Sequence, residues 1–152
     1  SSRLTILYGS QTGNAQSIAE GVHSECASRG IESVLLPLNE WKKLKPPLES
    51  QKVAVIIVST TGNGDPPENC DRFWRHLKRR THPKDVLEGV HFAMLGLGDS
   101  NYDKFCHTGK SMNTRLRELG AEAFYPLVCA DEALGLEDFV EPWLAGLWPA
   151  LD

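Results

Sequence analysis

The feature that most constrains the fold is an uninterrupted apolar and largely β-branched run over Val53–Val58. A strand with one face in water alternates apolar and polar residues, so a continuous run predicts a strand buried on both faces. Such strands belong to parallel sheets, in which the crossover connections place helices on both sides. We therefore expect strands and helices to alternate on either side of this run.

Short apolar runs and longer helical patterns do alternate along the chain. We predict strands over Leu4–Tyr8, Ser33–Leu36, Val53–Val58, Phe92–Leu97 and Phe124–Val128. The spacing of apolar positions predicts helices over Ala15–Ala27, Asn69–Arg80, Lys110–Leu119 and Leu136–Leu147. In the polar connection Asn39–Pro47, the Pro46-Pro47 pair excludes a long helix. The pattern predicts a single α/β domain over residues 1–152, a doubly wound five-stranded parallel sheet with helices on both faces.

Composition and charge exclude several function classes. The length of 152 residues suits one domain, and the net charge of −4 provides no basic surface for nucleic acid or an anionic membrane. The charge is unevenly distributed, because no Lys or Arg follows Arg117. A partner that meets the C-terminal third of the chain therefore meets negative charge.

The four cysteines, Cys26, Cys70, Cys106 and Cys129, form no C-x-x-C pair and have no His at a ligand spacing. This pattern predicts no metal site and argues against a disulfide scaffold. The chain also has no signal-peptide pattern and no apolar run of roughly 20 residues, the length that spans a membrane. We therefore expect a cytoplasmic protein with reduced thiols. Because Ser1-Ser2-Arg3 leads directly into a strand, we also expect a piece of a longer protein.

The loop after the first predicted strand has the composition of an anion cradle. Ligands of open parallel sheets bind beyond the carboxyl ends of the strands, where this loop lies. The sequence Gly9-Ser10-Gln11-Thr12-Gly13-Asn14-Ala15 opens a helix and offers backbone N–H groups and polar side chains to a phosphate. The loop contains no Lys or Arg, so only neutral hydrogen bonds would hold the anion. The alternative interpretation is a turn whose side chains cap the helix.

Three further loops should reach the same edge of the sheet. The segment Ser59–Pro67 contains two glycines and two prolines, which shape a turn whose backbone can approach a ligand closely. Gly96–Cys106 carries Tyr102, which could stack on a flat ring or only pack against a helix. Cys129-Ala130-Asp131-Glu132 adds two acids. Together these loops predict a mononucleotide site with a flat ring, and the missing cation argues against a nucleoside triphosphate.

Three of these segments resemble the motifs of a known protein family. Ser10–Ala15, Ser59–Pro67 and Leu97–Cys106, in this order and after these strands, are similar to the three FMN-binding loops of the flavodoxin family. The resemblance covers essentially the whole chain and implies FMN as cofactor and the flavodoxin-like strand order 2-1-3-4-5. The closing stretches Gly135–Trp143 and Trp148–Leu151 resemble the FMN domains of NADPH-dependent diflavin reductases. Within that group, the methionine synthase reductases are most similar at Thr60-Thr61-Gly62, Asp65-Pro66-Pro67, Gly96–Ser100 and Phe105-Cys106.

The resemblance also implies roles for individual residues. The segment Ser10–Ala15 would cradle the phosphate, Tyr102 would stack on one face of the isoalloxazine, and the Gly62 carbonyl would meet N5–H of the reduced ring. Asp131 matches an acid that assists electron transfer in haemoprotein-reducing relatives. Thr61 stands where many relatives have an aromatic residue, so the second ring face should be held less tightly. The full expected FMN-binding set is Ser10, Gln11, Thr12, Gly13, Asn14, Ala15, Ser59, Thr60, Thr61, Gly62, Asn63, Leu97, Gly98, Asp99, Ser100, Asn101, Tyr102, Phe105, Cys106 and Asp131.

The resemblance implies a one-electron transfer module in which the bound FMN, and no side chain, is the redox centre. An FAD/NADPH-binding reductase module, absent from this chain, would supply the electrons, so the chain alone should not use NADPH. The acceptor would be a methionine synthase that depends on cobalamin, or a haemoprotein. We expect it to dock on an acidic face that includes Asp131, Glu132, Glu137, Asp138 and Glu141.

Two alternatives differ in partner or in class. A free-standing flavodoxin carrier would have the same chemistry but a separate reductase. A phosphoacceptor signalling module on the same fold would need an Asp at the end of the third strand and an acid pair after the first. The chain has Ser59-Thr60 and Gly9-Ser10 at these places, which argues against the signalling module.

Overall fold

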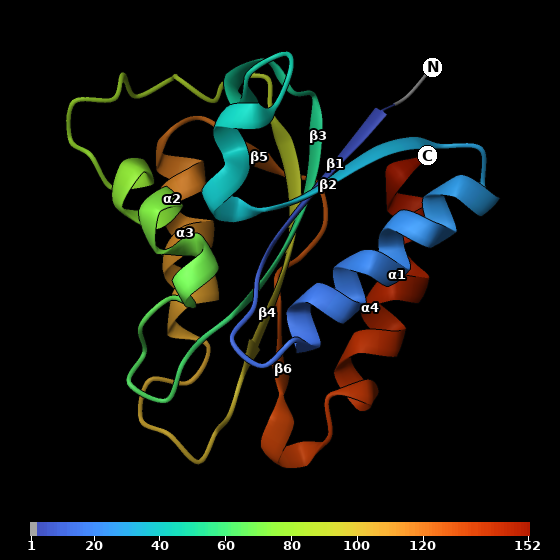
Figure 1. The fold of residues 1–152 in the computed structure, drawn as a ribbon, viewed down its shortest axis with the longest axis vertical. Helices are drawn as coiled ribbons and strands as arrows, with labels where there is room; N and C mark the ends of the chain where they lie inside the picture. Colours follow the sequence, from blue (N-terminus) through green and yellow to red (C-terminus); the bar gives the residue numbers. More distant parts are fainter. Residues whose placement is uncertain (1–2) are drawn as a thin grey trace.

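The computed structural model describes residues 3–152, in which a parallel sheet lies between two pairs of helices (Figure 1). Neighbouring strands follow the order β2-β1-β3-β4-β5, with β6 also paired to β4. All of these pairings are parallel, so the predicted doubly wound fold and its strand order are confirmed. The strands are β1 (Arg3–Gly9), β2 (Glu32–Pro37), β3 (Val53–Ser59), β4 (His91–Gly98), β5 (Glu122–Ala123) and β6 (Val128–Asp131).

The register brings the carboxyl ends of the three central strands together. Gly9 of β1 pairs with Val58 of β3, and Ser59 pairs with Leu97 of β4. The apolar run Val53–Val58 was predicted to be a strand buried on both faces, and its residues from Ala54 to Val58 are indeed buried. The loops that follow β1, β3 and β4 therefore start side by side at one edge of the sheet, at the bottom of Figure 1.

The predicted fifth strand, Phe124–Val128, is wrong. The chain pairs with β4 in two pieces, β5 and β6. The Phe124 N–H still donates to the Phe92 carbonyl of β4 at 3.0 Å, and residues 125–127 then leave the ladder. Pro126 has no N–H to donate to a neighbouring strand. Tyr125 instead turns to α4 (Glu137–Leu151), where its hydroxyl donates to the Trp143 carbonyl at 2.8 Å. As a result, Cys129, Ala130 and Asp131 lie within a strand and not in the loop after it.

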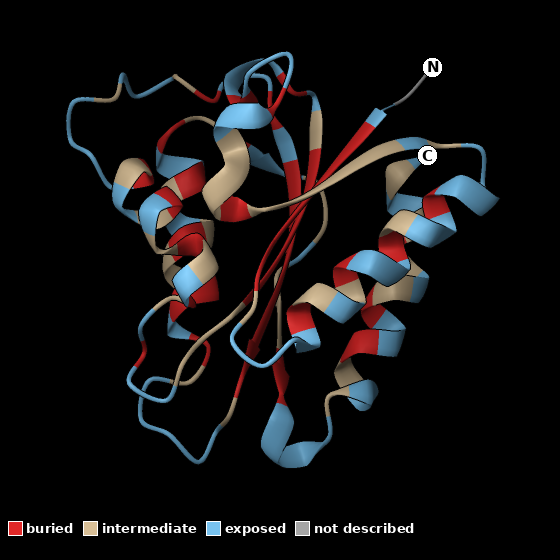
Figure 2. Ribbon diagram, viewed as in Figure 1, coloured by how far each residue is buried: buried red, intermediate tan, exposed pale blue. Residues whose placement is uncertain are grey.

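Each face of the sheet is covered by two helices. Helices α1 (Asn14–Ser28) and α4 cover one face, and Trp143 and Leu147 of α4 are buried there. Helices α2 (Asp71–Leu77) and α3 (His107–Glu118) cover the other, with Phe73 and Met112 in the core. Figure 2 shows the buried strands in the middle and exposed residues in the loops. None of the helices described over residues 3–152 is long and apolar enough to cross a membrane.

Several helix boundaries differ from the predicted ones. The helix expected over Asn69–Arg80 starts as a 3-10 turn, Glu68–Cys70, and its α-helical part ends at Leu77. Arg115 of α3 explains this end, because its guanidinium donates to the carbonyls of Leu77 (2.8 Å) and Arg79 (2.9 Å) in place of further helix N–H groups. Short 3-10 turns also occur at Leu38–Lys43, within the connection predicted as polar, and at Leu48–Ser50 and Glu132–Leu134.

The last helix is longer than predicted. Helix α4 runs to Leu151 although Pro142 and Pro149 lie inside it, and the prediction ended at Leu147. Each proline removes one helix hydrogen bond. Burial of Trp143 and Leu147 on the same side of the helix offsets that loss, since a large buried side chain contributes about 1.5–3 kcal/mol.

Candidate functional site

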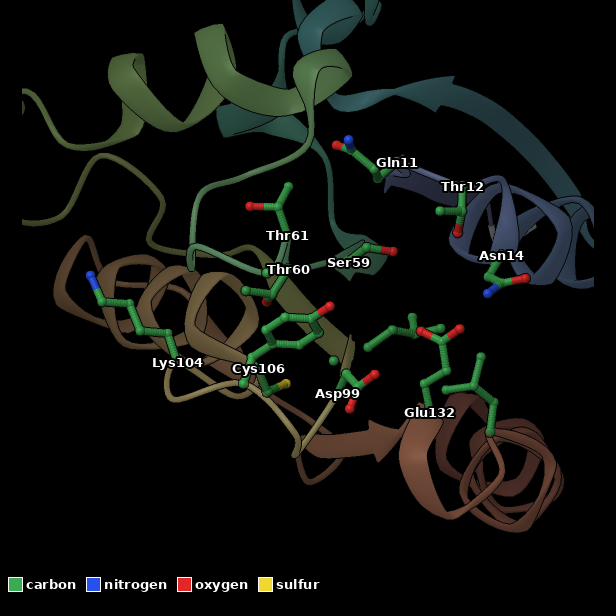
Figure 3. A pocket seen from close by; sticks show the side chains of 15 residues that line it. Gln11, Thr12, Asn14, Ser59, Thr60, Thr61, Asp99, Lys104, Cys106 and Glu132 are labelled. Atoms are coloured by element: carbon green, nitrogen blue, oxygen red, sulfur yellow. The ribbon is translucent and has the colours of Figure 1, made fainter.

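A cleft of about 310 Å³ lies at the carboxyl edge of the sheet (Figure 3). It is formed by the loops after β1, β3 and β4 and by the turn that follows β6. This is the edge at which the sequence predicted a site. The residues that line it are Gln11, Thr12, Asn14, Ser59, Thr60, Thr61, Gly62, Leu97, Gly98, Asp99, Tyr102, Lys104, Cys106, Glu132 and Leu136.

The loop after β1 presents the N-terminus of α1 to the cleft. Gly13, at φ 94°, makes the turn into the helix, and its N–H donates to the Ser10 hydroxyl oxygen at 2.9 Å. The first intrahelical hydrogen bond of α1 joins the Ser17 N–H to the Gly13 carbonyl, so the N–H groups before Ser17 have no acceptor within the helix. No side chain among the described residues caps α1, which leaves these donors for a ligand. The interpretation as a side-chain cap is therefore wrong, although Ser10 does hold a turn.

The loop after β3 is a tight turn fixed by its own backbone. The Thr61 N–H donates to the Asp65 carbonyl at 3.0 Å, and the Gly64 N–H donates back to the Thr61 carbonyl at 2.9 Å. Gly64 has φ 87°, a conformation that few other residues adopt. The Thr60 hydroxyl oxygen accepts from the Thr108 N–H at 3.1 Å and ties the turn to α3. The turn is thus held rigidly around Gly62.

The loop after β4 places an aromatic ring at the mouth of the cleft. Asp99 orders this loop, since its carboxylate accepts from the Asn101 N–H at 2.9 Å and its carbonyl accepts from the Tyr102 N–H at 3.0 Å. Tyr102 is 53% exposed, which is unusual for a residue with a large, mostly apolar ring. A Cβ on Gly62 would come within 3.2 Å of this ring, so the backbone of Gly62 lies directly against it. An exposed ring in this position is available to stack on a planar ligand.

The two adjacent acids at the end of β6, Asp131 and Glu132, occupy different positions. Asp131 is buried, and its carboxylate oxygen accepts from the N–H groups of Ser100 and Ala133, both at 3.0 Å. The Ser100 side chain, and after it the N–H groups of Ser100 and Ala133, hold the pKa of Asp131 below its ordinary value against the opposing effect of burial. Asp131 does not line the cleft, whereas the exposed Glu132 does. The sequence predicted Asp131 beside the ligand. Of the two acids, the structure places Glu132 in the lining of the cleft and Asp131 outside that lining.

The two ends of the cleft differ in charge and chemistry. Figure 3 shows Thr12 and Asn14 at one end and Lys104 at the opposite end. The alkyl chain of Lys104 lies over Gly64, where Cδ comes within 2.5 Å of the position a Cβ would take. The end next to α1 therefore offers only neutral hydroxyl, amide and backbone donors. Among residues 3–152 no cluster of three or more His, Cys, Asp or Glu is placed to hold a metal ion.

The cleft brings together twelve residues of the predicted set and leaves eight outside its lining. Ser10 lines an adjoining groove, where its N–H donates to Asn69, and Ala15 is buried in the core. Sequence reasoning missed Lys104, Glu132 and Leu136. The first two stand inside loops that the sequence singled out, but nothing in the pattern marked Leu136. The predicted residues that do not line the cleft are Ser10, Gly13, Ala15, Asn63, Ser100, Asn101, Phe105 and Asp131.

Comparisons with known proteins agree with this geometry. Residues 6–143 match the Flavodoxin family. Methionine synthase reductase of Bos taurus is 43% identical over 150 residues, which are 99% of this chain but 21% of that protein. NADPH-dependent diflavin oxidoreductase 1 of Danio rerio is 39% identical over 145 residues, 94% of this chain and 24% of that protein. The chain therefore spans about a fifth to a quarter of the length of these relatives.

Solved structures of similar shape are flavodoxins. A flavodoxin mutant from Pseudomonas aeruginosa superposes with a TM-score of 0.82, is 29% identical, and covers 98% of both chains. Flavodoxin 2 from Bacillus cereus superposes with a TM-score of 0.74 at 25% identity, with 98% of this chain covered and 97% of that one. Both superpositions therefore cover nearly the whole chain.

Proposed function

The chain belongs to the flavodoxin family, whose domain binds FMN, and from this premise we propose that the cleft serves one-electron transfer between a reductase module and a protein acceptor. When bound, FMN supplies the redox chemistry, because its isoalloxazine ring takes up and releases electrons singly. The protein has to hold the phosphate, orient the ring and leave one ring edge accessible to a partner. Each of these tasks has a counterpart among the residues of the cleft.

The observation that carries the proposal is the contrast between the two ends of the cleft. At the α1 end, the free N–H groups of the first helical turn and the side chains of Thr12 and Asn14 fit a phosphate monoester held without a cation. At the other end, the exposed Tyr102 against the backbone of Gly62 fits a flat ring. A nucleoside triphosphate would need metal ligands and a Lys at the phosphate end. Lys104, at the opposite end, cannot supply this function.

The ring would be fixed mainly by the rigid loops after β3 and β4. Tyr102 would cover one face, and the turn from Thr61 to Gly64 would present the Gly62 carbonyl to the ring edge. Thr61 lines the cleft where an aromatic residue would shield the second face more fully. Leu136 lines the wall next to Glu132 and would exclude water from part of the ring.

The partners follow from the relatives and from the charge of the chain. Methionine synthase reductase and the diflavin oxidoreductase are about four to five times as long as this chain, which supports electron supply from an FAD/NADPH module. Glu132, Glu137, Asp138 and Glu141 are exposed next to the cleft or along the start of α4. This acidic face suits a basic docking surface on the reductase module or on the acceptor. A methionine synthase or a haemoprotein is the acceptor that we expect.

Three flavins distinguish the proposed cradle from a nonspecific aromatic cleft. FMN, riboflavin and FAD should be titrated into the flavin-free protein, with quenching of flavin fluorescence as the readout. Riboflavin lacks the phosphate, so it should bind at least about tenfold more weakly than FMN, which corresponds to about 1.4 kcal/mol. FAD should also bind more weakly, because its second phosphate has no partner. Equal affinity for FMN and riboflavin would contradict the phosphate cradle.

A control variant and a reductant complete the test. Thr12→Val removes a donor from the cradle and should weaken FMN binding but leave riboflavin binding unchanged. Thr81→Val, in the exposed α2–β4 connection, should change neither affinity. NADPH alone should leave the FMN-loaded chain oxidised, and an added NADPH-dependent reductase should bleach it. Rapid bleaching by NADPH alone would contradict a separate reductase module.

A further inference from the structure

Two cysteines meet where β4, β6 and the start of α3 come together. Gly96 of β4 pairs in register with Cys129 of β6, and paired residues of neighbouring strands face the same side of the sheet. The Sγ atom of Cys106 lies within 2.5 Å of the position that a Cβ on Gly96 would take. Cys106 therefore fills the place of the missing Gly96 side chain, directly beside Cys129. The two thiols influence each other, and the pKa of Cys106 rises while that of Cys129 falls.

Two glycines keep space for this sulfur. A Cβ on Gly109 would come within 3.4 Å of the Cys106 Sγ and 3.1 Å of the Gly96 Cα. Cys106 itself has φ 56° and is the only non-glycine residue with positive φ among residues 3–152. A side chain in the left-handed region is uncommon. The structure thus holds a cysteine in an unfavourable backbone conformation next to a second cysteine, at the wall of the cleft.

The two thiols differ in accessibility and acidity. Cys106 is fully buried, whereas Cys129 is half-buried. The neighbouring Cys106 thiol lowers the pKa of Cys129, and the ammonium of the exposed Lys110 acts in the same direction against the effect of burial. The neighbouring Cys129 thiol and burial raise the pKa of Cys106. Cys129 is therefore the thiol that loses its proton first and meets reagents from solvent.

We propose that Cys106 and Cys129 form a redox-active thiol pair, which a small-molecule disulfide such as oxidised glutathione converts into a disulfide beside the cleft. The Cys129 thiolate attacks one sulfur of oxidised glutathione, the glutathione S–S bond breaks, and one glutathione leaves as a thiolate that takes up a proton. The Cys106 thiol then loses its proton and attacks the Cys129 sulfur, and the second glutathione leaves. Two protein thiols lose two electrons and two protons, and one oxidised glutathione becomes two reduced ones.

The bond would join two walls of the cleft region. Cys106 lines the cleft and follows the loop of Tyr102, whereas Cys129 precedes Asp131 in β6. A disulfide has an S–S length of about 2.05 Å, shorter than any contact between two separate thiols, so its formation draws the start of α3 toward β6. The remaining cysteines, Cys26 and Cys70, are buried in separate hydrophobic clusters, and burial raises the pKa of Cys70 to about 12. They are therefore matched internal controls.

The test exposes the native chain to oxidised glutathione, followed by acid quenching, intact mass measurement and peptide mapping. The wild type should lose two of its four thiols, retain no glutathione, and yield one linked peptide that contains Cys106 and Cys129. Dithiothreitol should restore all four thiols. Cys106→Ser should retain one glutathione on Cys129, and Cys129→Ser should keep its three thiols. Cys26→Ser should form the same disulfide as the wild type.

Three results would overturn the proposal. The wild type could keep four thiols, carry a stable glutathione on Cys129, or form a link that includes Cys26 or Cys70. The wild-type peptide map and the Cys26→Ser control decide the matter even if a variant of Cys106 fails to fold. None of these measurements uses FMN, so their outcome is separate from that of the proposed function.

Discussion

Asp131 accepts a hydrogen bond from the backbone N–H of Ser100 at 3.0 Å, which ties the end of β6 to the loop that carries Tyr102. The same oxygen accepts from the Ala133 N–H and fixes the turn that carries Glu132. One buried carboxylate thus positions two walls of the cleft without lining it. We therefore regard Asp131 as a positioning residue.

Substitution of Asp131 should separate hydrogen bonding from charge. Asp131→Ala removes the acceptor, so the Ser100 and Ala133 N–H groups lose their partner and the Tyr102 loop loosens. We expect a several-fold rise in the FMN dissociation constant and a lower Tm. Asp131→Asn keeps an oxygen acceptor and should bind FMN nearly as the wild type does. Equal FMN affinity in the wild type and Asp131→Ala would show that this hydrogen bond does not position the site.

The lowered pKa of Asp131 also predicts a pH dependence of stability. The hydrogen bonds favour the ionised carboxylate in the folded chain, so this group contributes stability above the unfolded pKa of about 4. That contribution is lost as the pH falls through the lower pKa of the folded state. Between pH 7 and pH 3, the Tm of the wild type should therefore fall more steeply than that of Asp131→Asn. Parallel Tm curves for the two proteins would contradict this assignment.

Gly62 should be the backbone position most sensitive to an added side chain. A Cβ there would lie 3.2 Å from the Tyr102 ring, and the branches of Val would extend further toward it. Gly62→Val should displace Tyr102, raise the FMN dissociation constant by about tenfold, or about 1.4 kcal/mol, and shift the one-electron potentials of the bound flavin. Gly21→Val is the control, because Gly21 is an exposed position of α1 with open space around an added Cβ. Unchanged potentials in Gly62→Val would refute the role of its carbonyl.

The acidic face predicts how electron transfer depends on salt. Glu137 and Asp138 are exposed in the first turn of α4, and neither lines the cleft. At 0.15 M salt the Debye length is about 8 Å, so steering by these charges should weaken steeply as salt increases. Glu137→Lys with Asp138→Lys should slow bimolecular electron transfer to a basic acceptor and flatten its salt dependence, with FMN affinity unchanged. If the double variant kept the wild-type electron-transfer rate and salt dependence, the acceptor would dock on another surface.

The sequence predicted the sheet and the place of the cleft because both rest on local signals. The apolar run Val53–Val58 indicated a buried parallel strand, and glycine and hydroxyl residues marked the loops at strand ends. The split of the last strand depended on a tertiary contact, the hydrogen bond from Tyr125 to Trp143. The early end of α2 likewise depended on Arg115, which is 38 residues from Leu77 in the chain.

The individual lining residues were harder to predict than the loops. A loop sequence shows which residues are near an edge but not which way each side chain points. Asp131 and Glu132 are adjacent acids, yet backbone N–H groups bind the first and the second faces the cleft. Leu136 enters the lining only because the turn after β6 brings the start of α4 to the cleft. Such orientations are set by packing between distant segments.

The most direct test of the central claim is a potentiometric titration of the FMN-loaded chain, in which the visible absorption spectrum reports the redox state of the flavin. If the cleft is built for one-electron transfer, the bound flavin should be reduced in two resolved one-electron steps whose potentials differ from those of free FMN. In the proposed site, the Gly62 carbonyl and the Tyr102 ring would provide the contacts that separate the two potentials. A single two-electron step at the potential of free FMN, or a chain that retains no FMN, would contradict the account.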